Sequence, residues 1–333
     1  MEITVRTMQG SYPIIIEHGV LNRVKELVKD RHVFVVSDDG VPETYRKQLM
    51  SQFPEGSIHV FPNGEASKNL NTFEKILKDM LDKGVSRNDT LIALGGGVVG
   101  DLAGFAAASY MRGIKFINIP TTMLSQIDSS IGGKTAVDLA GVKNCVGAFW
   151  QPSMVIIDPD VLNTLPPRQM SNGLAEAVKM GLTGDEKLFE IFEKDDYLCH
   201  VDEIIERSLG YKKQIVEEDE RESGLRKLLN FGHSYGHGYE AHDEFGRYLH
   251  GECVAMGMMT VLENGEIRDR LEKVLLRLNL PVRGEFDSRR VLELMMHDKK
   301  SDHGKLTIVQ VDEIGKGHLE SWTAEEIERR LLK

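Results

Sequence analysis

The amino-acid sequence predicts two domains, an α/β domain with a mostly parallel sheet followed by a mainly α-helical domain. The chain has 333 residues, which is more than one hydrophobic core usually serves. Up to about residue 160, short apolar runs alternate with helical patterns, as in a parallel sheet that carries helices on both faces. Beyond that point helical periodicity dominates. We therefore expect domains over residues 1–160 and 161–333.

The elements predicted in the first domain follow one another as strand, turn and helix. A short buried strand over residues 32–37 ends in acidic residues and a glycine. A strand at 90–94 leads through a glycine turn into a helix of small residues, and KFINIPTT and SMVIIDPDVL are predicted as two more strands. A helix that Gly84 ends is indicated by apolar residues at helical spacing: Phe73, Ile76, Leu77, Met80 and Leu81.

The second domain is predicted from a succession of helical patterns. A double proline precedes the segment RQMSNGLAEAVKMGL, which has the pattern of a buried helix. Only KLTIVQVD, near the C-terminus, has the pattern of a strand. The other predicted helices cover residues 188–192, 201–216, 251–270, 271–278 and 323–332.

The composition narrows the class of function. A net charge of −11 disfavours a nucleic-acid partner, because binding a phosphate backbone requires a basic surface. The N-terminal sequence lacks the basic region and apolar core of a signal peptide, and no apolar run reaches the roughly 18 residues of a membrane span. Three widely spaced cysteines fit a reducing compartment. We therefore expect a cytoplasmic protein that acts on a small molecule and has no membrane partner.

The glycine turn GGGVVGD satisfies the G-x-G-x-x-G pattern between a strand and a helix. Glycines allow the backbone to approach a pyrophosphate, and the following helix supplies free N–H groups. Tight packing of helix on strand is the alternative explanation, and Asp101 alone is typical of a first helical turn. No acidic residue ends a strand about twenty residues later, as the dinucleotide pattern requires. The ribose candidates lie elsewhere: Asp38, Glu65 and Lys68.

The segment SQIDSSIGGKTAVDLAGVKN has few apolar residues and several glycines, so we expect a flexible active-site loop. Its charged and polar residues are Asp128, Lys134, Lys143 and Asn144, and Arg112 precedes it at the end of the glycine helix. Lysines along such a loop can surround a phosphate or a carboxylate. Ordinary surface charge is the alternative.

Four histidines lie within eighteen residues: His233, His237, His242 and His250. Two histidines four residues apart share one face of a helix, as zinc ligands do, although the metalloprotease pattern H-E-x-x-H is absent. Glu176 lies on an apolar helix, with Lys179 one turn along it. Two histidines and one carboxylate would suit a catalytic divalent metal with an open position. The spacing alone does not identify the ligands, and Glu252 and Cys253 are competing donors.

Taken together, these segments resemble the 3-dehydroquinate synthase family. The resemblance implies a Rossmann-like first domain and an active site in the cleft between the two domains. The matching words run in family order from about residue 38 to 300: NGEASK, LGGGVVGDLAGFAAASYMRG, PTTMLSQIDSSIGGKTAV, LNTLPPRQ, GLAEAVK, DERESGLRKLLNFGHSYGH, LHGE and DKK. The departures are few: Gln169 stands where many relatives carry Glu, and Cys145 replaces an apolar residue.

The resemblance also implies roles for individual residues. The metal ligands would be Glu176, His233 and His250, and the catalytic residues would be Glu222, His237, Lys134 and Asp128. Arg112 would reach the site of a neighbouring subunit in a homodimer. The substrate contacts would be Arg112, Asn144, Lys179, Lys212, Arg226, Asn230 and, within DKK, Lys299. The NAD contacts would be Asp38, Glu65, Lys68, Gly97, Val98, Val99, Gly100, Asp101, Thr121, Thr122, Lys143, Thr164 and Leu165.

The implied reaction is a lyase step of the shikimate pathway that needs NAD and a zinc or cobalt ion. The substrate would be 3-deoxy-D-arabino-heptulosonate 7-phosphate. An alcohol is oxidised transiently, phosphate leaves by β-elimination, the ketone is reduced again, and the opened ring closes by an intramolecular aldol step. The rival interpretations are another sugar-phosphate cyclase, a metal-dependent polyol dehydrogenase, and a catalytically inactive binding protein. The pair Arg226 and Asn230 favours the shikimate substrate, which carries a carboxylate.

Overall fold

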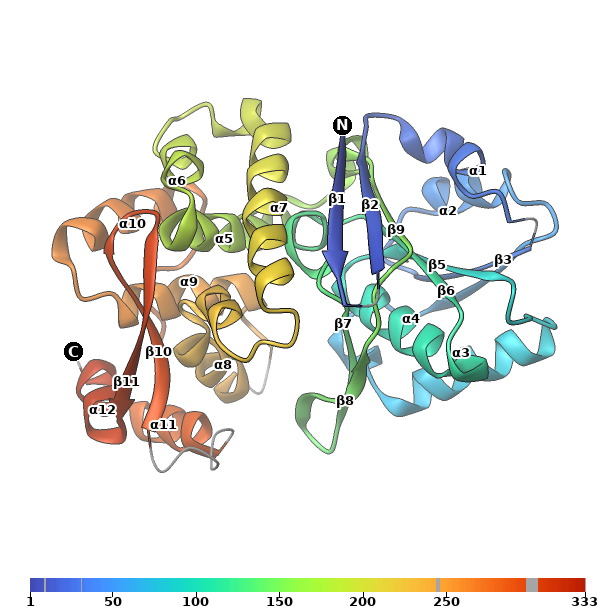
Figure 1. Cartoon of the computed structure of the whole chain (residues 1–333). Helices are drawn as coiled ribbons and strands as arrows, with labels where there is room; N and C mark the ends of the chain where they lie inside the picture. The colour runs from blue at the N-terminus through green and yellow to red at the C-terminus, as the bar shows by residue number, and fades with distance from the viewer. Residues whose placement is uncertain (9, 31, 244–245, 298–304, 333) are drawn as a thin grey trace. The chain divides into compact units, whose positions relative to one another are not determined.

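The computed structural model describes residues 1–8, 10–30, 32–243, 246–297 and 305–332 (Figure 1). The chain divides into two compact units, Met1–Pro166 and Pro167–Lys333. The division falls within the double proline, where the missing backbone N–H groups and restricted φ angles favour a break between elements. No helix among the described residues is long and apolar enough to cross a membrane.

The first unit contains a seven-stranded sheet in the order β1-β2-β9-β6-β5-β3-β4, which confirms the mostly parallel sheet predicted from the sequence. β1 runs antiparallel to β2, and the other neighbouring pairs are parallel. The hairpin of β1 and β2 was not among the predicted elements. The strands are β1 (Glu2–Thr7), β2 (Gly10–Ile16), β3 (Val33–Asp38), β4 (Ser57–Phe61), β5 (Thr90–Gly95), β6 (Lys115–Pro120) and β9 (Met154–Ile157).

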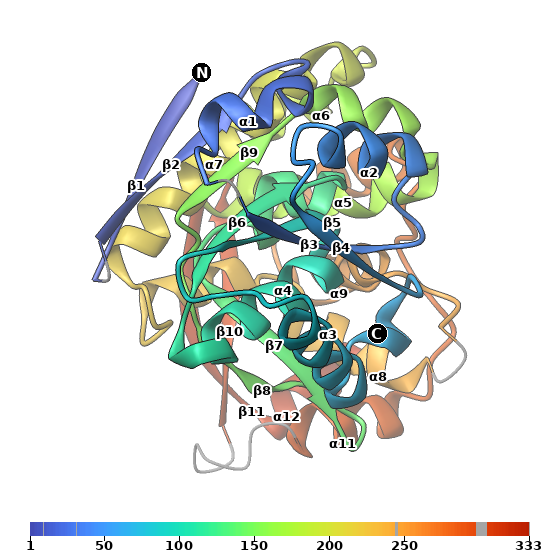
Figure 2. The same ribbon diagram turned by 90° about the vertical axis from the view of Figure 1, so that its right-hand side faces the viewer.

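Helices cover both faces of this sheet, with α1 and α2 on one face and α3 and α4 on the other (Figure 2). The side chains of β3 alternate between the two layers. Phe34 and Val36 pack with α3 and α4, whereas Val33 and Val35 pack with α1 and α2, and all four are fully buried. A strand buried on both faces is therefore a continuous apolar run. The helices are α1 (Val24–Leu27), α2 (Glu43–Met50), α3 (Leu70–Asp82) and α4 (Gly97–Ser109).

The segment predicted to be a flexible loop, residues 125–144, is ordered secondary structure. It begins with a π-helix, Ser125–Ser129, and continues into a hairpin of β7 (Lys134–Leu139) and β8 (Val142–Phe149). Ala140 and Gly141, at the turn, both have positive φ angles, which suits the twist of a two-residue hairpin. Only Thr135 and Val137 of β7 are buried, so the apolar pattern was too short to reveal a strand.

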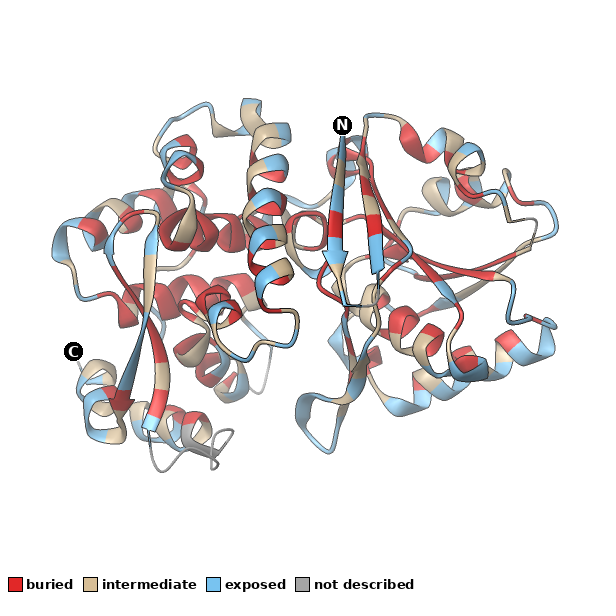
Figure 3. Cartoon of the chain, viewed as in Figure 1, coloured by how far each residue is buried: buried red, intermediate tan, exposed pale blue. Residues whose placement is uncertain are grey.

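The second unit is mainly helical, as predicted. α5 and α9 are buried along most of their length (Figure 3), and the long ribbon of β10 and β11 is antiparallel. The elements are α5 (Pro167–Gly184), α6 (Glu186–Phe192), α7 (Val201–Glu218), α8 (His233–His242), α9 (His250–Val261), α10 (Gly265–Arg277), α11 (Ser288–His297), β10 (Lys305–Glu313), β11 (Lys316–Thr323) and α12 (Ala324–Leu331).

Two details of this unit correct the sequence-based expectation. The predicted helix 251–270 is interrupted, because Asn264 accepts hydrogen bonds from the N–H groups of Glu266 and Ile267 and so starts a new helix. The region 271–278 continues that helix. Residues 316–323 form a strand that the sequence did not indicate, because its residues are mostly exposed or half-buried and lack a buried apolar face.

Glycines allow α8 and α9 to approach each other closely. A Cβ atom on Gly257 of α9 would lie 2.1 Å from the carbonyl oxygen of Gly232, and one on Gly236 would lie 3.0 Å from that of Cys253. Gly232 precedes α8 with a φ of 76°, a left-handed conformation that favours glycine. The starts of α8 and α9 carry His233 and His250, so this packing brings two predicted ligands together.

We predict that Gly257→Ala lowers the free energy of unfolding by about 1–3 kcal/mol, because the methyl group forces the two helices apart. Urea denaturation measures the change. The matched control is Gly210→Ala in α7, where no atom lies within 4 Å of an added Cβ. The control is expected to stabilise the protein by about 0.5–1 kcal/mol. Equal stability of Gly257→Ala and the wild type would contradict the close packing.

Candidate functional site

The predicted nucleotide residues of the first unit lie at the carboxyl ends of neighbouring strands. Asp38 ends β3, the glycine turn follows β5, and Thr121 and Thr122 follow β6. β4 lies on one side of β3 and β5 on the other, so the strand order reverses between β3 and β5. In open α/β sheets, ligands bind at this kind of reversal. The topology therefore gathers residues that are more than eighty positions apart at one edge.

The glycine turn allows tight packing and leaves backbone N–H groups that suit an anion. A Cβ atom on Gly95 would lie 2.4 Å from Val99, whose side chain is fully buried, so the turn allows tight packing of helix on strand. Gly96 is the N-cap of α4, and no side chain caps that end of the helix. The first N–H groups of α4 thus remain suited to a phosphate. Val99 could contact a nucleotide only through its backbone.

Lys68 connects the glycine helix to the β7–β8 hairpin. It is buried, its ammonium group lies 2.6 Å from the carboxylate of Asp101, and it also donates to the side chain of Asn144. Burial opposes the charge on Lys68, but the carboxylates of Asp101 and Glu65 outweigh it and raise the pKa of Lys68. Burial also raises the pKa of Asp101, despite the nearby ammonium group of Lys68. The family resemblance implies an NAD contact for Lys68 and a substrate contact for Asn144, and the structure brings the two side chains into contact.

The other predicted residues of this unit differ in environment. Asp38 is buried, which raises its pKa, and one of its oxygens accepts from the N–H groups of Gly40 and Val41 in its own turn. Arg112 is exposed. Both Arg112 (φ 65°) and the preceding Met111 (φ 49°) adopt left-handed backbone conformations. Strained non-glycine residues of this kind concentrate at functional sites. The half-buried residues among the rest are Asp128, Thr122 and Leu165, and the exposed residues are Glu65, Lys134, Lys143, Asn144 and Thr164.

Among the described acidic residues of the second unit, Glu176 is the most deeply buried. Its side chain is 1% exposed, and its Oε2 pairs with the ammonium group of Lys179, which is equally buried. Its Oε1 has no hydrogen-bond partner among the described residues. The Nε2 atoms of His233 and His250 each lie 3.5 Å from this oxygen. Two imidazoles from the first residues of α8 and α9 therefore converge on one unsatisfied carboxylate oxygen.

The other ring nitrogens fix which atoms face Glu176. The Nδ1 of His233 lies 3.2 Å from the carbonyl oxygen of Phe231, and the Nδ1 of His250 lies 3.3 Å from the carboxylate of Glu240. Both partners are acceptors, so each Nδ1 carries a proton, which leaves Nε2 as the atom that faces Glu176 and that presents a lone pair to a metal when the ring is neutral. Metal-binding histidines are usually held in this way. The sequence did not single out Glu240.

These distances fit a bound divalent cation. Zinc lies about 2.0–2.2 Å from carboxylate and imidazole ligands, so two tetrahedral ligands of one ion are separated by about 3.4 Å. The observed 3.5 Å is too long for a normal hydrogen bond but matches that separation. Although burial opposes its ionisation, Lys179 and the two imidazoles lower the pKa of Glu176 well below its usual range. The carboxylate is therefore anionic and suited to a metal.

The two imidazoles differ in charge in the absence of a metal. Burial lowers the pKa of His233 to about 3. Burial also opposes the charge on His250, but the carboxylates of Glu176 and Glu240 outweigh it and raise its pKa to about 10. His233 is thus ready to act as a ligand, while a metal must displace a proton from His250.

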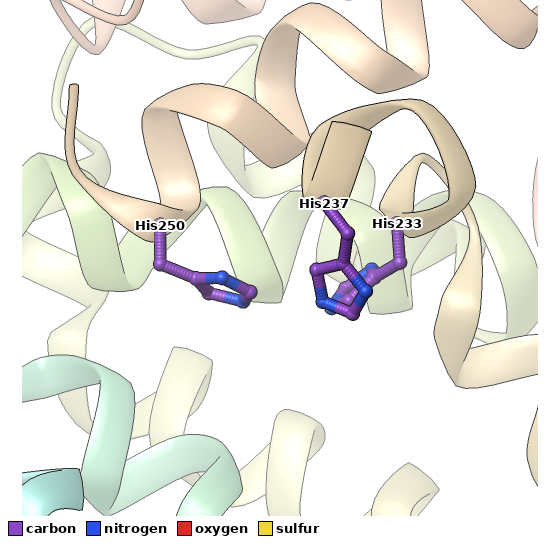
Figure 4. Close-up of side chains that lie close together, drawn as sticks. All are labelled: His233, His237 and His250. Atoms are coloured by element: carbon purple, nitrogen blue, oxygen red, sulfur yellow. The ribbon is translucent and has the colours of Figure 1, made fainter. Parts of the chain in front are cut away.

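His237 completes a cluster of three imidazoles. Figure 4 shows its ring beside those of His233 and His250, and ligand atoms of all three lie within 4.8 Å of one another. His237 is the exposed member, so it is an alternative ligand or a group that faces the substrate. His242 lies apart: its ring packs on Phe286, and its Nε2 lies 3.4 Å from the N–H of Asp287. Glu252, a competing donor, instead binds Arg168.

α7 and the loop that follows it carry the remaining predicted residues. Asp219 accepts hydrogen bonds from the N–H groups of Ser223, Gly224 and Arg226, all at 2.7–3.0 Å. Glu222 adopts a left-handed conformation (φ 60°) and accepts from the side chain of Asn230 at 2.7 Å. Two cations, Lys212 and Arg226, are buried. Sequence reasoning missed Asp219, although acidic residues that precede Ser and Gly often organise turns. Lys299 lies outside the described residues.

Both units of the chain match models of one known protein family. Residues 58–172 match the family model described as 3-dehydroquinate synthase N-terminal, and residues 173–301 match the model of the C-terminal part. The 3-dehydroquinate synthase of Streptococcus mutans serotype c is 39% identical over the full length of both chains.

Solved structures share the fold. A 2-deoxy-scyllo-inosose synthase complexed with carbaglucose-6-phosphate, NAD+ and Co2+ is 25% identical, with a TM-score of 0.89 over 99% of each chain. The 2-epi-5-epi-valiolone synthase from Streptomyces hygroscopicus subsp. jinggangensis 5008, with NAD+ and Zn2+ bound, is 27% identical, with a TM-score of 0.87 over 96% of each chain.

The loop organised by Asp219 gives a pH prediction. Although burial opposes ionisation, hydrogen bonds from the Gly224, Arg226 and Ser223 backbone lower the pKa of Asp219. Its stabilising effect is therefore complete above the unfolded-state pKa of about 3.9 and is lost as the pH falls through the folded-state pKa. Asp219→Asn should lower the unfolding free energy by about 1.5–3 kcal/mol at pH 7.

Urea denaturation at pH 7 and pH 3 tests this prediction. The difference in unfolding free energy between Asp219→Asn and the wild type should be smaller at pH 3 than at pH 7. Asp195→Asn is the control, because that carboxylate is 97% exposed and forms only a surface ion pair with Arg277. A constant gap at both pH values would refute the assignment of the effect to the charge of Asp219.

Proposed function

Because the chain belongs to the 3-dehydroquinate synthase family, we propose that it converts 3-deoxy-D-arabino-heptulosonate 7-phosphate into 3-dehydroquinate and phosphate. The observation that carries this proposal is the buried Oε1 of Glu176, which has no hydrogen-bond partner among the residues that the structure describes and faces two imidazoles. A structural ion pair would not need the two imidazoles, whereas an NAD- and metal-dependent lyase needs such a centre.

Two cofactors are part of the proposal, NAD and one Zn2+ or Co2+ ion. Glu176, His233 and His250 would hold the metal, and the carboxyl ends of β3, β5 and β6 would hold NAD, with Lys68 and Asp101 beside the glycine turn. When bound, NAD accepts and returns a hydride, and the metal polarises the oxygen of the reacting carbon.

The cations of the chain would bind the anionic groups of the substrate. Lys179, Lys212 and Arg226 are all at most 5% exposed, so their charges act in surroundings of low dielectric despite the net charge of −11. We assign Arg226 and Asn230 to the substrate carboxylate, because a guanidinium and an amide suit its geometry. The remaining proposed substrate contacts are Arg112, Asn144 and Lys299.

Proton transfer is assigned to Glu222 and His237, with Lys134 and Asp128 as further catalytic residues. Glu222 is half-buried and held by Asn230, so its carboxylate has a defined position. His237 is exposed and lies one helical turn from His233, the proposed ligand, so its ring would face a substrate oxygen. These groups would move protons during oxidation, elimination and ring closure.

The assembly and location of the protein are part of the same proposal. We propose a homodimer in which Arg112 reaches the neighbouring subunit, and light scattering tests this assembly. None of the three cysteines forms a disulfide, which suits a reducing compartment such as the cytoplasm.

We predict that the purified protein, loaded with NAD and zinc, releases inorganic phosphate from the heptulosonate phosphate. A panel of other sugar phosphates, including phosphorylated ketoses and the aldose glucose 6-phosphate, tests the rival sugar-phosphate cyclases, and polyols tested for net NAD reduction address the dehydrogenase alternative. Phosphate release should require both cofactors, with no net NADH, because the hydride is returned in each turnover.

Asn230→Ala should reduce kcat/KM at least tenfold, because it removes a contact to the carboxylate and the partner of Glu222. The proposal would be wrong if the folded, metal-loaded protein released no phosphate, or if a ketose without a carboxylate reacted faster.

A further inference from the structure

One face of α5 carries three polar residues at intervals of four: Arg168, Asn172 and Glu176. Residues at this spacing lie one above the other on a helix. Their partners on the first turn of α9 run in the opposite order, from Glu252 through Gly251 to His250. α5 and the start of α9 therefore meet at three successive points, and the last of them is the proposed metal centre.

The middle contact is the tightest. The Oδ1 of Asn172 accepts a hydrogen bond from the N–H of Gly251 at 2.6 Å, and Asn172 is buried. This N–H belongs to the first turn of α9, where no intrahelical acceptor exists, so Asn172 supplies the missing partner. A Cβ atom on Gly251 would lie 2.0 Å from the carbonyl oxygen of Asn172. The two backbones are thus in direct contact at this point.

The contact between Arg168 and Glu252 also holds the first turn of α9. Arg168 binds Glu252 through two parallel hydrogen bonds of 2.7 and 2.8 Å. Glu252 is largely buried, and its carboxylate also accepts from the N–H of Leu249 at 2.8 Å, which caps α9. Arg168 further donates to the carbonyl oxygen of Arg247. The residues on both sides of His250 are therefore attached to α5.

We propose that Asn172 and Arg168 are positioning residues of the metal centre, which fix the separation between Glu176 and His250. This inference rests on the metal ligands proposed above. His250 is the first residue of α9, and Glu176 lies one turn beyond Asn172, so a shift of α9 along α5 changes the distance between the two ligands directly. Ligand distances must be held to within about 0.2 Å for full affinity.

General helix packing is the competing explanation, and the chain offers a matched control for it. Gln310 is buried and donates to the carbonyl oxygen of Val261, the last residue of α9, at 2.9 Å. Gln310→Ala therefore removes a buried side-chain hydrogen bond from the same helix, at the end remote from His250. If Asn172 positions His250, Asn172→Ala should weaken metal binding and Gln310→Ala should not.

The experiment titrates metal-free protein with Zn2+ in competition with a chromophoric chelator, and records the visible spectrum of the Co2+ form. Asn172→Ala should bind Zn2+ about 10–100-fold more weakly than the wild type, with altered Co2+ bands. Asn172→Asp, which retains an oxygen acceptor, should keep the wild-type affinity or exceed it. Gln310→Ala should remain within about threefold of the wild type, the usual reach of a remote substitution.

His250→Ala separates the two levels of the proposal. If the wild type bound no Zn2+, the metal centre itself would be wrong. If His250→Ala lost the metal while Asn172→Ala kept full affinity, only the positioning role would be overturned. Equal weakening in Asn172→Ala and Gln310→Ala would also overturn it. Arg168→Ala, which leaves the Asn172 contact in place, provides a second variant and should show a smaller loss of affinity.

Discussion

The arrangement of the helices in the second unit depends on the buried carboxylate of Glu176, whose Oε2 is paired with Lys179 while its Oε1 has no hydrogen-bond partner among the described residues. Removing an ion from water costs several kcal/mol even after relaxation, so Glu176 needs compensation on both oxygens. Lys179 compensates Oε2, and the imidazoles of His233 and His250 approach Oε1 at 3.5 Å, the separation expected of ligands that share one cation. The electrostatics of this one side chain thus determine why two histidines distant in sequence converge on α5.

That convergence requires close and precise packing of three helices. Glycines remove the side chains that would separate α8 from α9, and Gly251 does the same between α5 and α9. Hydrogen bonds at Nδ1 then orient each imidazole. The first unit uses a different principle, because the sheet topology gathers the ends of β3, β5 and β6, and Lys68 connects the glycine helix to a hairpin. Each unit thus preorganises one set of polar groups.

Much of this arrangement could be predicted from local sequence pattern. Short, mostly apolar runs revealed β3 and β5, and the glycine pattern located the start of α4. The spacing of His233 and His237 indicated a metal site but not the proposed ligand set, since Glu176 lies on a helix 57 residues before His233 (233 minus 176). Family resemblance identified that residue. The β7–β8 hairpin was missed because it buries few side chains, and Asn172 was missed because its role depends on a contact distant in sequence.

The most direct test is an anomalous diffraction map at the zinc edge, from crystals of the zinc-loaded protein. The account predicts one peak about 2.0–2.2 Å from Glu176 Oε1, His233 Nε2 and His250 Nε2, with His237 outside the coordination sphere. A zinc ion bound by all three imidazoles, with Glu176 paired to Lys179 alone, would contradict it.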